Sequence, residues 1–178
     1  MRNKILAVAM AVAGVAVSGV SMAATDGTVG ATSTGTVVIN ATIPKLIRIT
    51  GLADITMVLP APVDDDLGYT AAATGSSPAC VRQNGGTATY GIVATSANTA
   101  FELANGALAP VPYSLTWGGT ALAYNTALTA QTPDSTTLGA CAAVADKLEV
   151  SITAADLNDA EGSTTDYTDT VTLVVTPE

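Results

Sequence analysis

The sequence predicts an all-β domain, a β-sandwich, from three observations. Short runs rich in β-branched and aromatic residues recur along the chain after residue 23, and several of them alternate apolar with polar residues. This period of two is typical of a half-buried strand. Turn signals separate the runs, the clearest being Asn84-Gly85-Gly86 and Gly118-Gly119. A single segment, residues 154–162, has a helical pattern. About nine or ten short strands in this arrangement favour a sandwich.

Residues 1–23 are predicted to be a cleaved secretory signal peptide. Arg2 and Lys4 precede an apolar stretch over residues 5–20, and small residues lead to a cleavage site before Ala24. The alternative is an uncleaved membrane anchor. The apolar stretch is short for a spanning helix and no basic cluster follows it, so we expect no membrane insertion after cleavage.

The mature chain is acidic. Its basic residues are Lys45, Arg48, Arg82 and Lys147, against all 15 acidic residues, which gives a net charge of −11. Such a surface repels nucleic acid and anionic lipid, and we expect neither as a partner.

The strongest strand pattern lies in residues 36–52 (TVVINATIPKLIRITGL). One face of its first half carries Val37, Ile39, Ala41 and Ile43, and the pattern resumes after Pro44. A proline inside such a run indicates an edge strand, a bulge or a change of sheet. We predict the first strand of the sandwich here. The domain organisation is then a signal peptide over 1–23, a flexible arm over 24–35 and a β-sandwich domain over 36–178.

The remaining elements follow from the same patterns. Further strands are expected over residues 53–59, 67–73, 79–83, 87–95, 101–103, 111–117, 121–124, 147–153 and 167–176. Residues 75–78 and the Asn84-Gly85-Gly86 hairpin are expected to be turns. Inward-facing residues are expected at Val111, Tyr113, Leu115 and Trp117, and in the last strand at Tyr167, Val171, Leu173 and Val175.

Cys80 and Cys141 are predicted to form a disulfide. An even number of cysteines in an exported chain favours this pairing. In the chain-entropy model, a loop of this length stabilises the fold by about 4 kcal/mol. A metal site built on the two cysteines is the alternative, but the chain has no histidine and no paired Cys-x-x-Cys motif.

The sequence carries no pattern for catalysis, and we predict that the chain is not an enzyme. The absence of histidine excludes a nucleophile–His–Asp arrangement, and no nucleotide-binding motif occurs. The acidic residues lie in predicted turns with little aromatic surface, which disfavours glycoside hydrolysis. We therefore expect no catalytic residue and no cofactor.

Two binding alternatives remain open. A calcium ion could be held by Asp64, Asp65 and Asp66 or by the acids between residues 156 and 169, although neither group has EF-hand spacing. Solvated turns are the simpler interpretation, and we predict no metal site. A sugar-binding face could involve Tyr113, Trp117 and Tyr124, but core packing is the commoner role of such residues.

Three stretches resemble a known class of protein. The opening GTVVINATI, the middle TYGIVATSANTAFELANG and VPYSLTW, and the closing YTDTVTLVV are similar to chaperone–usher fimbrial pilins and to secreted domains like spore coat protein U. The resemblance spans most of the mature chain. It rests on strand and turn patterns, because these families have no fixed catalytic signature.

The resemblance implies an immunoglobulin-like, pilin-like β-sandwich that passes through the periplasm to the cell surface. It implies a structural subunit of a fimbria-like fibre, which assembles identical copies by donor-strand exchange with a periplasmic chaperone and an outer-membrane usher. The resemblance implies a donor in the arm, with Val29 and Ala31 facing the groove. The stronger strand pattern of the next segment adds Val37, Ile39, Ala41 and Ile43 as assembly residues. The acceptor edge would involve the opening strand over residues 37–43 and the closing strand at Val171, Leu173 and Val175. Strand donation of this kind is β-augmentation.

The N-terminal arm leaves two readings open. It contains few large apolar residues, so either the donor extends into residues 36–43 with Pro44 at its end, or the domain is complete by itself. In the second case the chain would be a secreted or surface binding module for a carbohydrate or a protein.

Overall fold

The computed structural model describes residues 24–62, 68–86, 88–141 and 144–178, and the predicted signal peptide lies outside them. The chain divides into two units, Met1–Ile43 and Pro44–Glu178, and each is described by itself. In the described part of the first unit, Thr25 and Thr36 form an isolated antiparallel bridge, joined by reciprocal backbone hydrogen bonds of 3.0 and 2.9 Å.

Of the strand predicted over residues 36–52, the part after Pro44 is confirmed by β1 (Ile47–Thr50), whereas the part over residues 36–43 is wrong. Beyond the bridge at Thr36, these residues belong to no strand, and they are exposed. Their alternation specifies which face a strand would bury, but a strand also needs a partner for its backbone N–H and C=O groups. The described part of the first unit supplies none.

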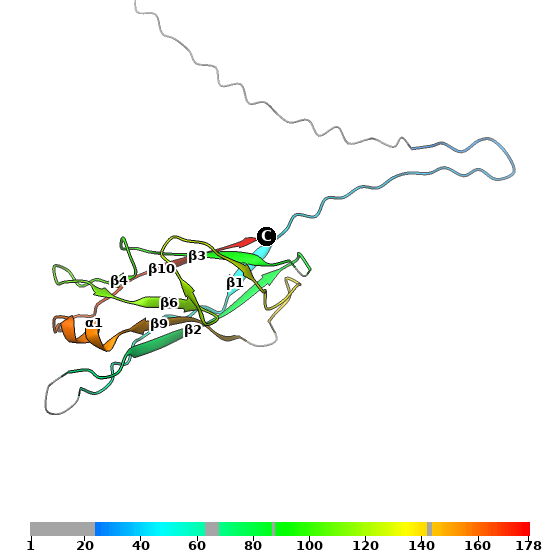
Figure 1. Ribbon diagram of the computed structural model, residues 1–178. Coiled ribbons are helices and arrows are strands. Elements are labelled where there is room, and N and C mark those ends of the chain that lie inside the picture. Colours follow the sequence, from blue (N-terminus) through cyan, green and yellow to red (C-terminus); the bar gives the residue numbers. More distant parts are fainter. Residues whose placement is uncertain (1–23, 63–67, 87, 142–143) are drawn as a thin grey trace, which may run out of the picture. The chain divides into compact units, whose positions relative to one another are not determined.

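The second unit is an all-β fold with one short helix among its described residues (Figure 1). The strands are β1 (Ile47–Thr50), β2 (Ala73–Gln83), β3 (Tyr90–Ser96), β4 (Glu102–Leu103), β5 (Val111–Pro112), β6 (Ser114–Trp117), β7 (Thr120–Leu122), β8 (Leu128–Gln131), β9 (Ala145–Ile152) and β10 (Val171–Pro177); the helix is α1 (Ala154–Asp159).

All strand pairs within the sheets are antiparallel. One sheet has the order β1-β2-β9-β6-β7, a second has the order β10-β3-β8, and β4 pairs with β5 alone. β2 and β3 follow each other in the chain but lie in different sheets. The Asn84-Gly85-Gly86 turn therefore carries the chain from one sheet to the other, and the expected hairpin at this point is wrong.

Inner faces of both sheets build one hydrophobic core. Val111, Tyr113, Leu115 and Trp117 are all buried, as their alternation predicts. At the centre, the indole Nε1–H of Trp117 in β6 donates to the hydroxyl oxygen of Tyr90 in β3 over 2.8 Å. This bond satisfies the polar end of a buried indole and joins the two sheets.

β2 is longer than predicted. The expected turn over residues 75–78 is wrong, because these residues lie within the 11-residue strand. Its inward positions there are small, and Gly75 lets Ile55 and Met57 approach: a Cβ on Gly75 would lie 2.5 Å from Ile55 Cγ2 and 2.8 Å from Met57 Sδ. A register shift at Ser77/Pro78 accommodates the proline as a bulge. Gly and Pro thus mark close packing and a bulge within a strand.

The predicted strand over residues 53–59 is also wrong, although Ile55 and Met57 pack against the core. Of the expected 67–73 strand, the described part joins β2 only at Ala73. The prediction over 147–153 is confirmed by β9, and that over 167–176 is confirmed from Val171 onward by β10. The turn expected at Gly118-Gly119 is confirmed, and it closes a hairpin between β6 and β7.

The helical pattern over residues 154–162 is confirmed in its first part by α1. Thr153 is the N-cap, and its side chain accepts a hydrogen bond from the Asp156 N–H. Within the residues that the structure describes, no helix has both the length and the apolar character needed to cross a bilayer.

Candidate functional site

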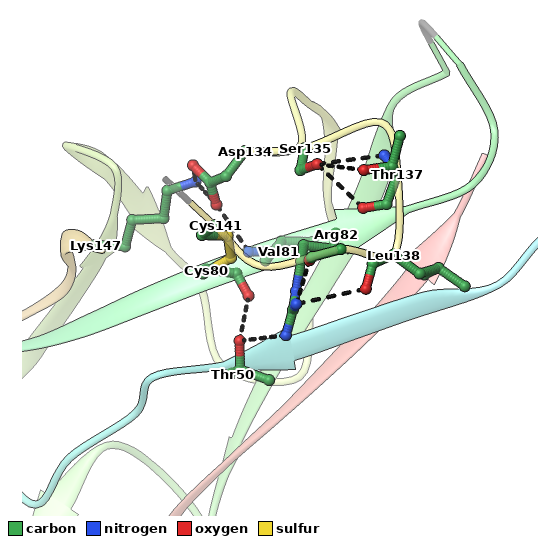
Figure 2. The surroundings of a disulfide bond; sticks show 11 residues. Thr50, Cys80, Val81, Arg82, Asp134, Ser135, Thr137, Leu138, Cys141 and Lys147 are labelled. Atoms are coloured by element: carbon green, nitrogen blue, oxygen red, sulfur yellow. Dashed lines mark hydrogen bonds and ion pairs between the residues drawn. A yellow bond between two sulfur atoms is a disulfide. The ribbon is translucent and has the colours of Figure 1, made fainter. Parts of the chain in front are cut away.

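The predicted disulfide is present and fastens a long loop onto β2 (Figure 2). Cys80 is buried in β2, and its Cα lies 6.5 Å from that of Cys141. Beside it, the Arg82 guanidinium donates to the carbonyl oxygen of Gly139 and, over 3.2 Å, to the hydroxyl of Thr50. The loop that ends at Cys141 is therefore held by a covalent bond and by hydrogen bonds from the same strand.

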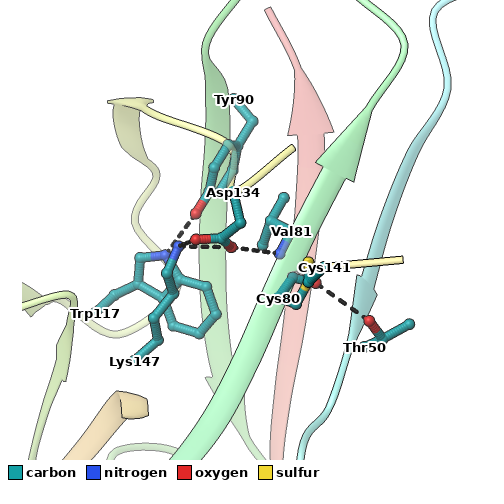
Figure 3. A network of polar contacts seen from close by, with 8 residues as sticks. All are labelled: Thr50, Cys80, Val81, Tyr90, Trp117, Asp134, Cys141 and Lys147. Atoms are coloured by element: carbon teal, nitrogen blue, oxygen red, sulfur yellow. Dashed lines mark hydrogen bonds and ion pairs between the residues drawn. A yellow bond between two sulfur atoms is a disulfide. The ribbon is translucent and has the colours of Figure 1, made fainter. Parts of the chain in front are cut away.

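A polar network beside the disulfide continues this attachment (Figure 3). The Asp134 carboxylate accepts from the Val81 N–H at 2.7 Å and pairs with the Lys147 ammonium at 2.7 Å. The Lys147 ammonium also lies 5.9 Å from the centre of the Trp117 ring. These groups satisfy one another, so the network is a structural anchor and offers no free reactive group.

A candidate site is the open side of β10, which is an edge strand of its sheet, as are β1, β7 and β8. On one side, β10 pairs with β3 along its whole length, from Val171↔Ser96 to Pro177↔Tyr90. On its other side, no strand of the described chain is hydrogen-bonded to it. β1 lies close to β10 near the end of that strand (Figure 1), but it pairs with β2. An unpaired edge presents backbone N–H and C=O groups to an added strand.

A cleft of about 780 Å³ opens between the segment after β1 and the segment before β10. Its floor includes the buried side chains of Val111, Ile152 and Leu157. Half-buried apolar side chains line its walls: Ile55, Met57, Tyr69, Leu103 and Tyr167. The apolar surface that remains partly exposed here therefore belongs to the walls and not to the floor.

Hydrogen bonds hold the walls of the cleft in place. The Asn158 side chain of α1 accepts from the Tyr69 N–H at 2.6 Å and donates to the Tyr69 carbonyl oxygen at 3.0 Å. On the opposite wall, Ala104 and Thr168 exchange backbone hydrogen bonds of 2.9 Å. The cleft is a formed feature because both walls are attached to regular elements.

Tyr113 and Asp169 lie beneath the start of β10. The Tyr113 hydroxyl donates to Asp169 Oδ2, which also accepts from the Ser96 hydroxyl at 2.6 Å. Burial raises the pKa of Tyr113 well above its ordinary value, and the Asp169 carboxylate raises it further. The tyrosine is a neutral donor at ordinary pH.

The structure does not bring the predicted donor residues onto a strand. Val29, Val37, Ile39 and Ile43 are 108%, 72%, 88% and 81% exposed, and Ala31 and Ala41 are exposed as well. On the predicted acceptor edge, Val171, Leu173 and Val175 are half-buried against the core and Val174 points outward. This placement corresponds to the alternation seen in the sequence.

The sugar-face alternative is wrong. Tyr113 and Trp117 are buried in the core, whereas Tyr124 is 37% exposed and packs edge-on against Phe101. Asp64, Asp65 and Asp66 lie outside the described residues. Among the described residues, no group of three or more acidic or cysteine side chains is arranged to hold a metal ion.

Sequence reasoning missed the cleft itself. Its walls come from residues 53–59 and from the segment between α1 and β10, which are far apart in the chain. A strand was expected over residues 53–59, but the sequence does not show which element those residues face. Comparison of the chain with protein-family models, curated proteins and solved structures gave no match.

Proposed function

We propose that this chain is a structural subunit of an extracellular bacterial surface fibre, in which residues 36–43 of one copy complete the sheet of the next. The observation that carries the proposal is the unpaired side of β10, together with a cleft with an apolar floor that is lined by the segment leading into β10. A strand added there would pair with β10 and cover apolar surface that is partly exposed.

The strand order supports an immunoglobulin-like sandwich that lacks its last strand. In that fold, strands A, B, E and D form one sheet, and C, F and G form the other. Here β1-β2-β9-β6 corresponds to A-B-E-D, and β3 and β10 correspond to C and F. Nothing in the described chain takes the position of G, which would pair with β10.

Residues 36–43 have the properties of the missing strand. Val37, Ile39 and Ile43 share one face and are largely exposed, so the segment has apolar surface to bury. β10 has seven residues, close to the length of this segment. Pro44 ends the segment, because proline cannot donate to a strand ladder. The arm residues Val29 and Ala31 precede the bridge at Thr36 and are the weaker donors.

The proposal includes export through the periplasm to the cell surface, with cleavage before Ala24. A chaperone and an usher are the proposed assembly partners, since a subunit with an unfilled groove needs protection before it meets the next copy. Unpaired edges with apolar neighbours otherwise aggregate.

An assembly test follows from the two faces of the donor. Ile39→Asp would place a carboxylate in the apolar groove, at a cost of several kcal/mol. We expect it to abolish SDS-resistant multimers in unboiled material from exporting cells. Val38→Asp changes the opposite face of the same segment and is the matched control, which should retain the multimers. Wild-type multimers that persist in Ile39→Asp would refute strand donation by this segment.

A self-complete binding module is the second candidate. The cleft volume lies within the range of about 300–1,000 Å³ that is usual for ligand sites, and its rim carries polar residues such as Asn158 and Glu161. A carbohydrate or protein ligand would then occupy the cleft of a stable monomer. Wild-type chain that is monomeric without a chaperone and binds in a glycan array would favour this candidate.

A further inference from the structure

We propose that Asn84 is a positioning residue that directs residues 36–43 to a second copy by preventing the chain from folding them onto its own β10. This inference rests on the proposed function. Asn84 Nδ2 donates to the Pro44 carbonyl oxygen at 2.9 Å, and Asn84 Oδ1 accepts from the Leu46 N–H at 2.7 Å. The Asn84 N–H also donates to the Leu46 carbonyl oxygen at 3.2 Å. Residues 44–46 are thus held by one side chain and its own backbone.

We call the pairing of residues 36–43 with β10 of the same copy self-docking. The position of residues 44–46, the junction between that segment and β1, decides what self-docking would require. Lys45 Nζ donates to the backbone oxygen of Glu178, so the junction lies at the C-terminal end of β10. From there β1 runs back beside β10 in the opposite direction (Figure 1). A chain whose residues 36–43 lay on its own β10 would have to reverse direction between Ile43 and Ile47.

The simplest reversal is a β-turn over residues 43–46, and Pro44 favours it. Proline is preferred at the second position of type I and II turns, and the closing hydrogen bond would run from the Leu46 N–H to the Ile43 carbonyl oxygen. Asn84 Oδ1 already accepts from that N–H. The side chain therefore occupies the donor on which the turn depends.

Such a block matters because self-docking has a large entropic advantage. A segment tethered by a short linker faces its own groove at an effective concentration of about millimolar, and this advantage disappears only where geometry forbids it. Copies that are not yet assembled meet at lower concentrations. Without a block at the junction, each subunit would fill its own groove and chain growth would stop.

Two substitutions at Asn84 distinguish the loss of this block on self-docking from a general loss of stability. Asn84→Ala removes the acceptor for the Leu46 N–H, whereas Asn84→Asp retains an acceptor oxygen and loses only the donor to Pro44. We expect Asn84→Ala to raise the ratio of monomer to SDS-resistant multimer about tenfold, the effect of one hydrogen bond. Asn84→Asp should remain close to wild type. Light scattering after size-exclusion chromatography measures the ratio.

The monomer that Asn84→Ala forms must also be shown to hold its own residues 36–43 against its own β10. Its melting temperature should exceed that of the double variant Asn84→Ala/Ile39→Asp, in which the segment cannot dock. Equal melting temperatures would overturn the inference, because loss of multimers would then reflect a damaged turn. Unchanged multimers in Asn84→Ala would also overturn it. Absence of multimers in the wild type would instead refute the proposed function itself.

Discussion

At the scale of single residues, Tyr113 and Tyr90 place phenol groups inside the core. Burial raises the pKa of both. The two differ in their partners: Tyr113 donates to a carboxylate, whereas Tyr90 accepts from the Trp117 indole. Each phenol is held in its neutral form, so alkaline pH acts on the core directly.

The free energy of unfolding should fall with rising pH from about pH 10. Above that value an unfolded tyrosine loses its proton while the folded one keeps it, so the unfolded state binds fewer protons and stability decreases, by up to about 1.4 kcal/mol per pH unit for each tyrosine. Below pH 10 both states are protonated and this contribution is fully present.

Tyr113→Phe tests the assignment. It removes one of the two groups and should reduce the slope of stability against pH above pH 10, measured by urea unfolding at several pH values. At neutral pH it should cost about 1 kcal/mol for the lost hydrogen bond. A slope identical to wild type would contradict the role given to Tyr113.

At the scale of elements, β2 changes neighbour along the edge that faces β9. Its first part, from Ala73 to Ala79, pairs with β9. Beyond Ala79, residues 134–135 replace β9 on this edge: Asp134 N–H donates to Val81 O at 2.8 Å, and Gln83 N–H donates to Ser135 O at 3.1 Å. The disulfide lies between these two parts and holds the second neighbour in place.

Replacing both cysteines with serine should therefore destabilise the chain by about 2–5 kcal/mol, the usual cost of losing a native disulfide. Amide exchange should rise first at Val81 and Gln83, whose N–H groups are bonded to the tethered loop. The Ala73–Ala79 part serves as the internal control because β9 covers it. Uniform loss of protection along β2 would argue against this division.

Most of the all-β fold could be predicted from the sequence. Alternation predicted the buried face of residues 111–117 and the half-buried face of β10, because those patterns report local burial. It failed at residues 36–43 and 53–59, where the apolar pattern is real but no strand in the described part of the chain pairs with these residues. The turn predicted at Gly75 and Pro78 was wrong because glycine and proline are compatible with a turn but also with a close contact or a bulge inside a strand. The cleft was not predictable, since its walls are brought together only by tertiary packing.

At the scale of the whole molecule, the proposed strand donation makes stability depend on assembly. A groove filled by a neighbour's segment adds the free energy of that interaction to the folded state. A subunit whose own segment is disabled should therefore be the least stable form, and should regain stability when a donor is supplied.

A synthetic peptide of residues 36–43 should raise the melting temperature of the full-length Ile39→Asp chain. At a peptide concentration of 100 times its dissociation constant the gain is about 2.7 kcal/mol, or roughly 5–10 °C for a domain of this size. The same peptide carrying Asp at position 39 is the control and should give no shift. Equal shifts with both peptides would indicate non-specific binding.

The position of the disulfide in the chain has a consequence for the order of folding. Every partner of the last part of β2 precedes residue 142: β1, residues 134–135 and Cys141 itself. β9 and β10 come later. In a chain that emerges from a membrane channel N-terminus first, we expect the cross-link to close while those two strands are still inside. β10, whose outer side stays unpaired in the folded chain, would then also be the last strand to leave the channel.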